Sequence, residues 1–215
     1  MTHPRLYVNC GPITELRPVL EKWRDINRNF YMELNDDCPW WYNERASISI
    51  LAAAAWQTEG FYAIEEFSTT KGRKRAKSGT LSERPGRCDL KIWTRSKQEF
   101  VFEAKQAWCK LDERIDLERK CDGILTSLAK AKGDARRLKT KMGRRLGTCF
   151  LSPRILSKEK DNLGPRLDDL LHLLINKKHH DAIAWFFVDD PSSLEDKETR
   201  LLYPGTVLLL KEVKK

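Results

Sequence analysis

The strongest constraint on folding in this chain is a pair of short segments, residues 88–94 and 99–106, in which apolar and polar side chains alternate. Alternation with a period of two places successive side chains on opposite faces of a strand. The polar residues 95–98 that separate the segments are few enough to form a hairpin turn. The two segments therefore predict neighbouring antiparallel strands, each with one face available for burial against a helix layer.

Apolar periodicity predicts further helices and strands around this hairpin. We expect helices at 12–34, 40–57, about 112–141 and 165–178, and further strands at 61–67, 146–151, 182–188 and 206–213. The polar, basic stretch 68–87 is expected to be a long loop. This order of elements predicts an α/β (α+β) fold with a central mixed sheet flanked by helices.

The length of 215 residues fits a single domain over 1–215. Within it we expect an N-terminal helical element at 1–38, a core at 39–151, and a helix and strands at 152–215 that complete the sheet.

The composition also limits where such a chain would work. No apolar run approaches the roughly 18 residues that a membrane span needs, and the first residues carry no apolar signal region. The six cysteines are not spaced as CxxC pairs, which argues against a structural zinc site and a disulfide framework. We therefore expect a cytoplasmic protein with reduced thiols and no membrane partner.

Charged residues fall at informative positions on the two predicted strands. Asp89 lies on the face opposite the apolar Leu90 and Ile92, and Glu103 and Lys105 share a face of the second strand. If the hairpin forms, Asp89, Glu103 and Lys105 point toward one cleft. Converging carboxylates repel unless a cation lies between them, and hard divalent ions prefer oxygen ligands. With a lysine beside them, such carboxylates suit metal-assisted phosphodiester hydrolysis.

Asp89, followed fourteen residues later by Glu103-Ala104-Lys105, resembles the signature of the PD-(D/E)XK nuclease superfamily. The resemblance implies a restriction-endonuclease-like core with the order helix, three strands, helix, strand (αβββαβ), placed here at 39–151. The sequence departs from the signature in one respect, because Cys88 rather than proline precedes Asp89.

The resemblance also implies a role for each matching residue. Asp89 and Glu103 would bind Mg²⁺ (or Mn²⁺), with the Ala104 backbone carbonyl as a further ligand. Lys105 would position or activate the attacking water, and Glu44, on the preceding helix, would hold a metal-bound water or a second metal. Three other carboxylates remain alternatives to Glu44 as the fourth acid: Glu59, Glu65 and Glu66.

Basic residues gather in two segments that flank these positions. The net charge is +9, yet residues 71–97 hold ten basic and two acidic residues, and residues 127–145 hold eight and one. These two segments carry more than the whole positive excess, which favours contact with phosphates. The expected nucleic-acid-binding residues are Lys71, Arg73, Lys74, Arg75, Lys77, Arg87, Lys130, Arg136, Arg137, Lys139 and Lys141.

Together the residues and the resemblance predict a Mg²⁺-dependent endonuclease that acts on double-stranded DNA, as in restriction, phage defence, repair or mobile elements. Three alternatives stay open. The chain could be a catalytically inactive nucleic-acid-binding protein on the same fold, a basic assembly subunit with an acidic protein partner, or an RNA nuclease. A homodimer or a protein partner is compatible with each, and the sequence identifies no dimer face.

Overall fold

A computed structural model of the chain describes residues 3–34, 36–72, 83–140 and 143–214. Short 3-10 turns connect several of its elements. In chain order the helices and strands are β1 (Leu6–Asn9), α1 (Arg17–Leu34), α2 (Glu44–Trp56), β2 (Phe61–Gly72), β3 (Glu83–Thr94), β4 (Glu99–Lys110), α3 (Leu117–Arg136), β5 (Arg144–Leu156), α4 (Leu163–Lys177), β6 (Ala182–Phe187), β7 (Glu195–Asp196), β8 (Leu201–Leu202) and β9 (Gly205–Glu212).

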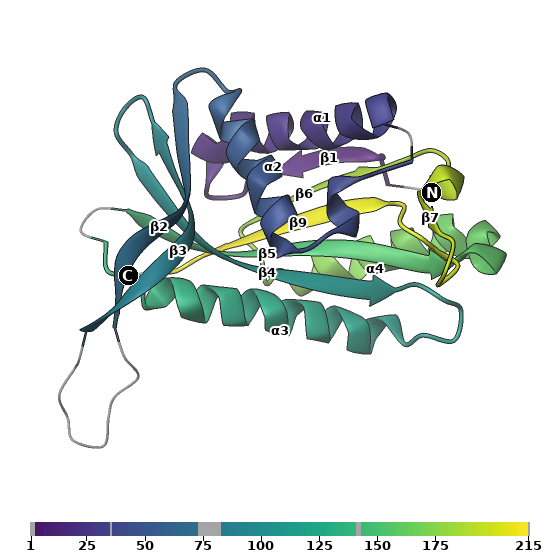
Figure 1. Ribbon diagram of the computed structural model, residues 1–215. Helices are drawn as coiled ribbons and strands as arrows, with labels where there is room; N and C mark the ends of the chain where they lie inside the picture. Colours follow the sequence, from purple (N-terminus) through teal and green to yellow (C-terminus); the bar gives the residue numbers. More distant parts are fainter. Residues whose placement is uncertain (1–2, 35, 73–82, 141–142, 215) are drawn as a thin grey trace.

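A mixed β-sheet with the strand order β1-β6-β9-β5-β4-β3-β2 forms the centre of the protein. The strands β4 and β5 are parallel, and the other neighbours in this order are antiparallel. Helices α1 and α2 cover one face of the sheet, while α3 and α4 cover the other (Figure 1). The expected α/β class, with a central mixed sheet flanked by helices, is therefore confirmed.

The alternation along β4 divides its side chains between two cores. Phe100 and Phe102 pack with residues of α1 and α2, such as Trp23. Ala107 and Cys109 point the other way and pack with residues of α3 and α4. Because both faces of the strand are covered, the polar residues that share these faces are drawn into the interior.

Two capping residues fix where the helices next to the site begin. The Asn43 side chain accepts hydrogen bonds from the backbone amides of Arg45 and Ala46, so α2 begins at Glu44. The Asp116 carboxylate accepts one from the amide of Arg119 and starts α3 at Leu117. Each helix therefore begins later than the predicted starts at 40 and 112.

Gly147 allows α3 to lie directly on β5. A Cβ atom at this position would lie 2.3 Å from the backbone nitrogen of Lys132, which is too close for any side chain. The helix and the strand therefore approach each other along their backbones, and this contact fixes the height of α3 above the sheet.

The expectation of a long loop over 68–87 is wrong at both of its ends. β2 continues to Gly72 and β3 begins at Glu83, and the two pair as far as Gly72 opposite Glu83. The residues Ser68-Thr69-Thr70 include two β-branched side chains, which suit a strand despite their polarity. The rest of the predicted loop, 73–82, lies outside the described residues.

The strand β1 was not predicted, because its segment is short and pairs only with the distant β6. Within the described ranges, no helix is long and apolar enough to cross a membrane.

Candidate active site

The strands β3 and β4 separate at the position of the predicted acidic residues. Their paired residues run from Trp93–Glu99 to Leu90–Phe102 and stop there, whereas β4 continues beside β5 to Lys110. On the other side of β3, Leu90 and Cys88 each pair with a residue of β2. Asp89, which lies between them, has no partner among the described residues of β2 and therefore falls in a gap of the ladder. Beyond Phe102, the described residues therefore leave β4 with one open edge.

The gap in the ladder between β2 and β3 coincides with an unusual backbone conformation at Glu66. Glu66, which would lie opposite Asp89, has a φ of 45°, in the left-handed region that non-glycine residues rarely occupy. Strain of this kind persists only where surrounding contacts enforce it. The Glu66 carboxylate is held by Arg45 at 2.9 Å and by Arg87 at 3.0 Å. At this gap in the ladder, the Asp89 side chain reaches the backbone of β4.

Two carboxylates bind the backbone amides on the open edge of β4, where β3 no longer pairs with it. Asp89 Oδ2 accepts a hydrogen bond of 2.7 Å from the Ala104 amide, and Glu44 Oε2 accepts one of 3.0 Å from the Gln106 amide. Alternate amides on one edge of a strand are roughly 7 Å apart. The two acids, one from a strand and one from the first turn of α2, therefore lie side by side on this edge.

The ammonium group of Lys105 lies on the same edge. Its Nζ atom donates a 2.6 Å hydrogen bond to the Ala104 carbonyl oxygen, and it lies 3.6 Å from Asp134 Oδ2 on α3. Because Ala104 offers its amide to Asp89 and its carbonyl to Lys105, this one residue holds a carboxylate and an ammonium group close together.

Glu103 is the most deeply placed acid of the cluster, with 3% of its surface exposed. Lys71 Nζ lies 2.7 Å from Glu103 Oε1. The ammonium approaches outside hydrogen-bonding geometry, so this buried oxygen has no aligned donor. The last part of β2 brings Lys71 to this position, and a backbone bridge between Lys71 and Leu138 ties it to the segment after α3.

Burial raises the pKa of both Glu103 and Glu44. At Glu103 the Lys71 ammonium opposes this shift, while the negative charge of Asp89 adds to it. At Glu44 the charge of Lys105 opposes the shift, and Asp89 again adds to it. Each carboxyl group would therefore gain from a further positive charge nearby.

The cluster fits a hard divalent cation by the type of its donors. Asp89, Glu103 and Glu44 offer carboxylate oxygens and Ala104 offers a carbonyl, which are the ligands that Mg²⁺ prefers. The buried Oε1 of Glu103 faces the Lys71 ammonium at 2.7 Å, and a metal ion there would take the place of that cation. In the described part of the chain, no three His, Cys, Asp or Glu side chains converge closely enough to hold a metal ion as they stand. Metal binding therefore requires the carboxylate groups to move closer together.

The structure brings together five of the predicted positions: Asp89, Glu103, Ala104, Lys105 and Glu44. It does not bring the alternative acids to this edge. Glu59 forms an ion pair of 3.2 Å with Arg95, Glu65 accepts a hydrogen bond of 2.9 Å from Ser49, and Glu66 forms the pairs with arginine described above. Each of these three acids is exposed.

Gln106 fixes the open edge of β4 against α2. Its side-chain oxygen accepts a hydrogen bond of 3.3 Å from Ser47, and its side-chain nitrogen donates one of 2.8 Å to Ser152. Ser152 in turn donates to the Trp40 carbonyl at 2.7 Å. No local sequence signal marks the two serines, because they lie far from Gln106 in the chain.

The predicted nucleic-acid-binding residues have different surroundings. Lys130 and Arg136 are exposed on α3, and Lys139 is exposed just after it. Arg137 pairs with Asp134 at 3.2 Å, Arg87 pairs with Glu66, and Lys71 points inward to Glu103. Five others lie outside the described residues: Arg73, Lys74, Arg75, Lys77 and Lys141.

Comparison with protein-family models, with curated proteins and with solved structures gave no match for this chain.

Proposed function

We propose that this protein is a metal-dependent nuclease of the PD-(D/E)XK type, in which α2, β2, β3, β4, α3 and β5 form a restriction-endonuclease-like core, and that it hydrolyses DNA. The observation that carries this proposal is the open edge of β4. There, the Asp89 and Glu44 carboxylates accept hydrogen bonds from alternate backbone amides. The Lys105 ammonium donates a hydrogen bond to the Ala104 carbonyl oxygen, which lies between these two amides.

The donor set assigns a ligand role to Asp89, Glu103 and the Ala104 carbonyl, with Glu44 beside them. A bound Mg²⁺ or Mn²⁺ would supply Lewis-acid stabilisation of a phosphoryl oxygen and lower the pKa of a coordinated water. The Lys105 ammonium would orient the attacking water and attract a phosphate oxygen. Glu44 Oε2 is engaged by the Gln106 amide, which leaves Oε1 to accept a proton from that water.

The charge beside the site supports a polyanionic substrate. Asp134, which lies 3.6 Å from Lys105, comes just before Arg136 and Arg137 at the end of α3. A nucleic-acid backbone that contacts these two arginines would run directly past the open edge of β4. Phosphate contacts of this kind position a duplex without specifying its sequence.

The proposal is tested by incubating the purified protein with plasmid DNA in Mg²⁺, in Mn²⁺ and in EDTA. We expect cleavage with either metal and none in EDTA. Lys105→Ala should abolish cleavage without lowering the melting temperature. Lys110→Ala, on the same strand but away from the cluster, is the matched control and should cleave normally. Failure to cleave duplex DNA, single-stranded DNA or RNA with either metal would overturn the proposal.

One observation favours the second candidate, a nucleic-acid-binding protein without catalysis. Lys71 already balances the charge of the buried Glu103 at 2.7 Å, so the folded chain does not need a metal there. This candidate predicts salt-dependent DNA binding with no cleavage and no Mn²⁺ binding in calorimetry. Heat of Mn²⁺ binding that is lost in Asp89→Asn would exclude it.

A further inference from the structure

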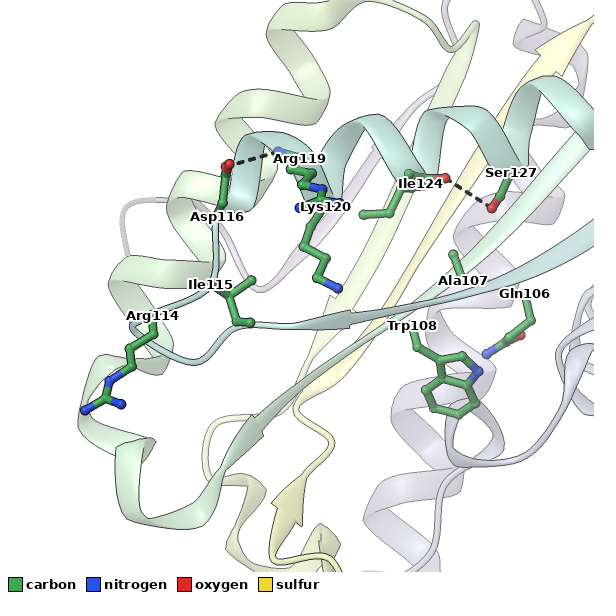
Figure 2. Close-up of a pocket in the computed structure, with 11 residues that line it drawn as sticks. Gln106, Ala107, Trp108, Arg114, Ile115, Asp116, Arg119, Lys120, Ile124 and Ser127 are labelled. Carbon is green, nitrogen blue, oxygen red and sulfur yellow. Dashed lines mark hydrogen bonds between the residues drawn. The ribbon is translucent and has the colours of Figure 1, made fainter.

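A groove of about 800 Å³ extends along the open edge of β4, away from the carboxylate cluster (Figure 2). Its walls come from Gln106, Ala107 and Trp108 of β4, and from Arg114, Arg119 and Lys120 on and just before α3. Gln106 joins the groove to the site, because its backbone amide binds the Glu44 carboxylate. A chain that crosses the site can therefore continue into the groove.

The groove is positively charged. Arg114, Arg119 and Lys120 are exposed, and in the described part of the chain they form no ion pair. The acid among the lining residues is Asp116, whose carboxylate is engaged as the cap of α3. The first turn of α3 adds its partial positive charge at the same place. Unbalanced cations beside a helix N-terminus favour an anionic ligand.

Trp108 gives the groove an aromatic surface that is fixed in place. The side chain is 36% exposed, and Figure 2 shows it on the side of β4 away from α3, whereas Lys120 extends from α3 toward the strand. The Arg154 guanidinium lies 5.4 Å from the centre of its ring, and Tyr203 packs at 84° with the centroids 5.9 Å apart. These contacts hold an exposed indole beside the Arg154 guanidinium, across the edge of β4 from the cations of α3.

An exposed tryptophan beside cations is suited to single-stranded nucleic acid. Unpaired bases can stack on an aromatic ring while their phosphates contact lysine or arginine, whereas the bases of a duplex are already stacked on one another. Within the described residues, the edge of β4 opposite β5 pairs with no strand at 106–108, so it adds backbone groups that a ligand can reach.

We propose that the single-stranded nucleotides next to the scissile phosphate cross the open edge of β4 at this groove, with a base on Trp108 on one side of the strand and phosphates at Arg119 and Lys120 on the other. The preferred substrate would then be DNA that carries a single-stranded overhang or branch. This inference rests on the proposed nuclease function, since it assigns a substrate class to the same site.

The binding test is carried out in EDTA, so that it does not depend on cleavage. Fluorescence anisotropy compares a single-stranded oligonucleotide, a duplex with an overhang and a blunt duplex. We expect the overhang to bind about tenfold more tightly than the blunt end, and Trp108→Ala and Lys120→Gln each to remove most of this difference. Trp56→Ala, which removes an exposed tryptophan on α2, is the control and should not change it.

Photocrosslinking gives a second measurement that a folding defect cannot imitate. An overhang that carries 5-iodouracil should crosslink to Trp108 in the wild-type protein, as mapped by mass spectrometry. Equal binding of blunt and overhanging duplexes, unchanged by both variants, would overturn the inference. So would crosslinks only at other sites, or displacement of the probe by an acidic peptide in preference to single-stranded DNA. Mg²⁺-dependent cleavage of blunt DNA in the same preparation would show that the nuclease proposal stands without the groove.

Discussion

Lys71 Nζ lies 2.7 Å from Glu103 Oε1, and this contact balances the charge of a glutamate whose surface is 3% exposed. The two residues come from opposite sides of β3, because Lys71 lies near the end of β2 and Glu103 lies on β4. The Lys71 ammonium therefore occupies a position where a metal ion would also be attracted by the negative charge of Glu103.

We expect Lys71→Met to destabilise the fold, because it leaves a buried carboxylate without its counter-ion. Breaking a buried pair by removing one partner costs about 3 kcal/mol, which urea denaturation at neutral pH would measure. The double variant Lys71→Met/Glu103→Gln removes both charges and should recover most of the loss. Equal stability of the wild-type protein and the single variant would show that the contact contributes nothing.

The same substitution should strengthen metal binding. With the ammonium gone, Glu103 lacks a cation, and calorimetry should show tighter binding of Mn²⁺ than in the wild-type protein. The double variant is again the control, since without the Glu103 charge this gain should disappear.

Stability should depend on pH through Glu103. Burial raises the pKa of this carboxyl above its ordinary value of 4.5, so the folded state holds the proton more tightly than the unfolded chain. The contribution is fully present below pH 4.5 and is lost as the pH rises through the raised pKa. Glu103→Gln removes this dependence. The check is the difference in unfolding free energy between the wild-type protein and Glu103→Gln from pH 4 to 7, which should change with pH in favour of the variant.

Glu44→Gln tests whether this acid acts in the reaction or only in the fold. A glutamine side chain can still accept the hydrogen bond from the Gln106 amide, so the melting temperature should change little. Loss of a proton acceptor should lower the cleavage rate by about 100-fold or more. Glu65→Gln, which alters an exposed acid of the neighbouring β2, is the matched control and should cleave at the wild-type rate.

Gly147→Ala tests the close contact between α3 and β5. The new methyl group would meet the Lys132 backbone at 2.3 Å, and we expect a loss of about 3 kcal/mol in thermal or urea unfolding. Gly133→Ala on α3 has nothing within 4 Å of the added atom, so it should instead stabilise the protein by about 0.5–1 kcal/mol. Equal effects of the two substitutions would contradict the packing described here.

The sequence predicted the features that depend on local patterns. The alternation in 88–94 and 99–106 predicted the paired strands β3 and β4, and apolar spacing located the four long helices to within a few residues. The expectation for Asp89, Glu103 and Lys105 used strand parity, which needs only neighbouring residues.

The remaining features depend on contacts between distant residues. The pairing of β3 with β4 ends at Leu90, close to the positive φ of Glu66 on β2, and no residue type in the sequence predicts this. Lys71 was expected at a nucleic-acid surface, since a basic run does not reveal which member turns inward. The sequence named Glu44 but left Glu59, Glu65 and Glu66 open as alternatives, because comparing them requires the position of α2 against β4.

The order of strands in the sheet has a consequence for synthesis of the chain. In the described part of the chain, β9 is the last strand to be translated and lies inside the sheet between β6 and β5, and β1, which is translated before the other strands, must wait for β6 before it can pair. All of the acids and the lysine of the site are translated long before this support exists. A nascent chain therefore cannot complete the sheet that supports its own site until β9 has been translated.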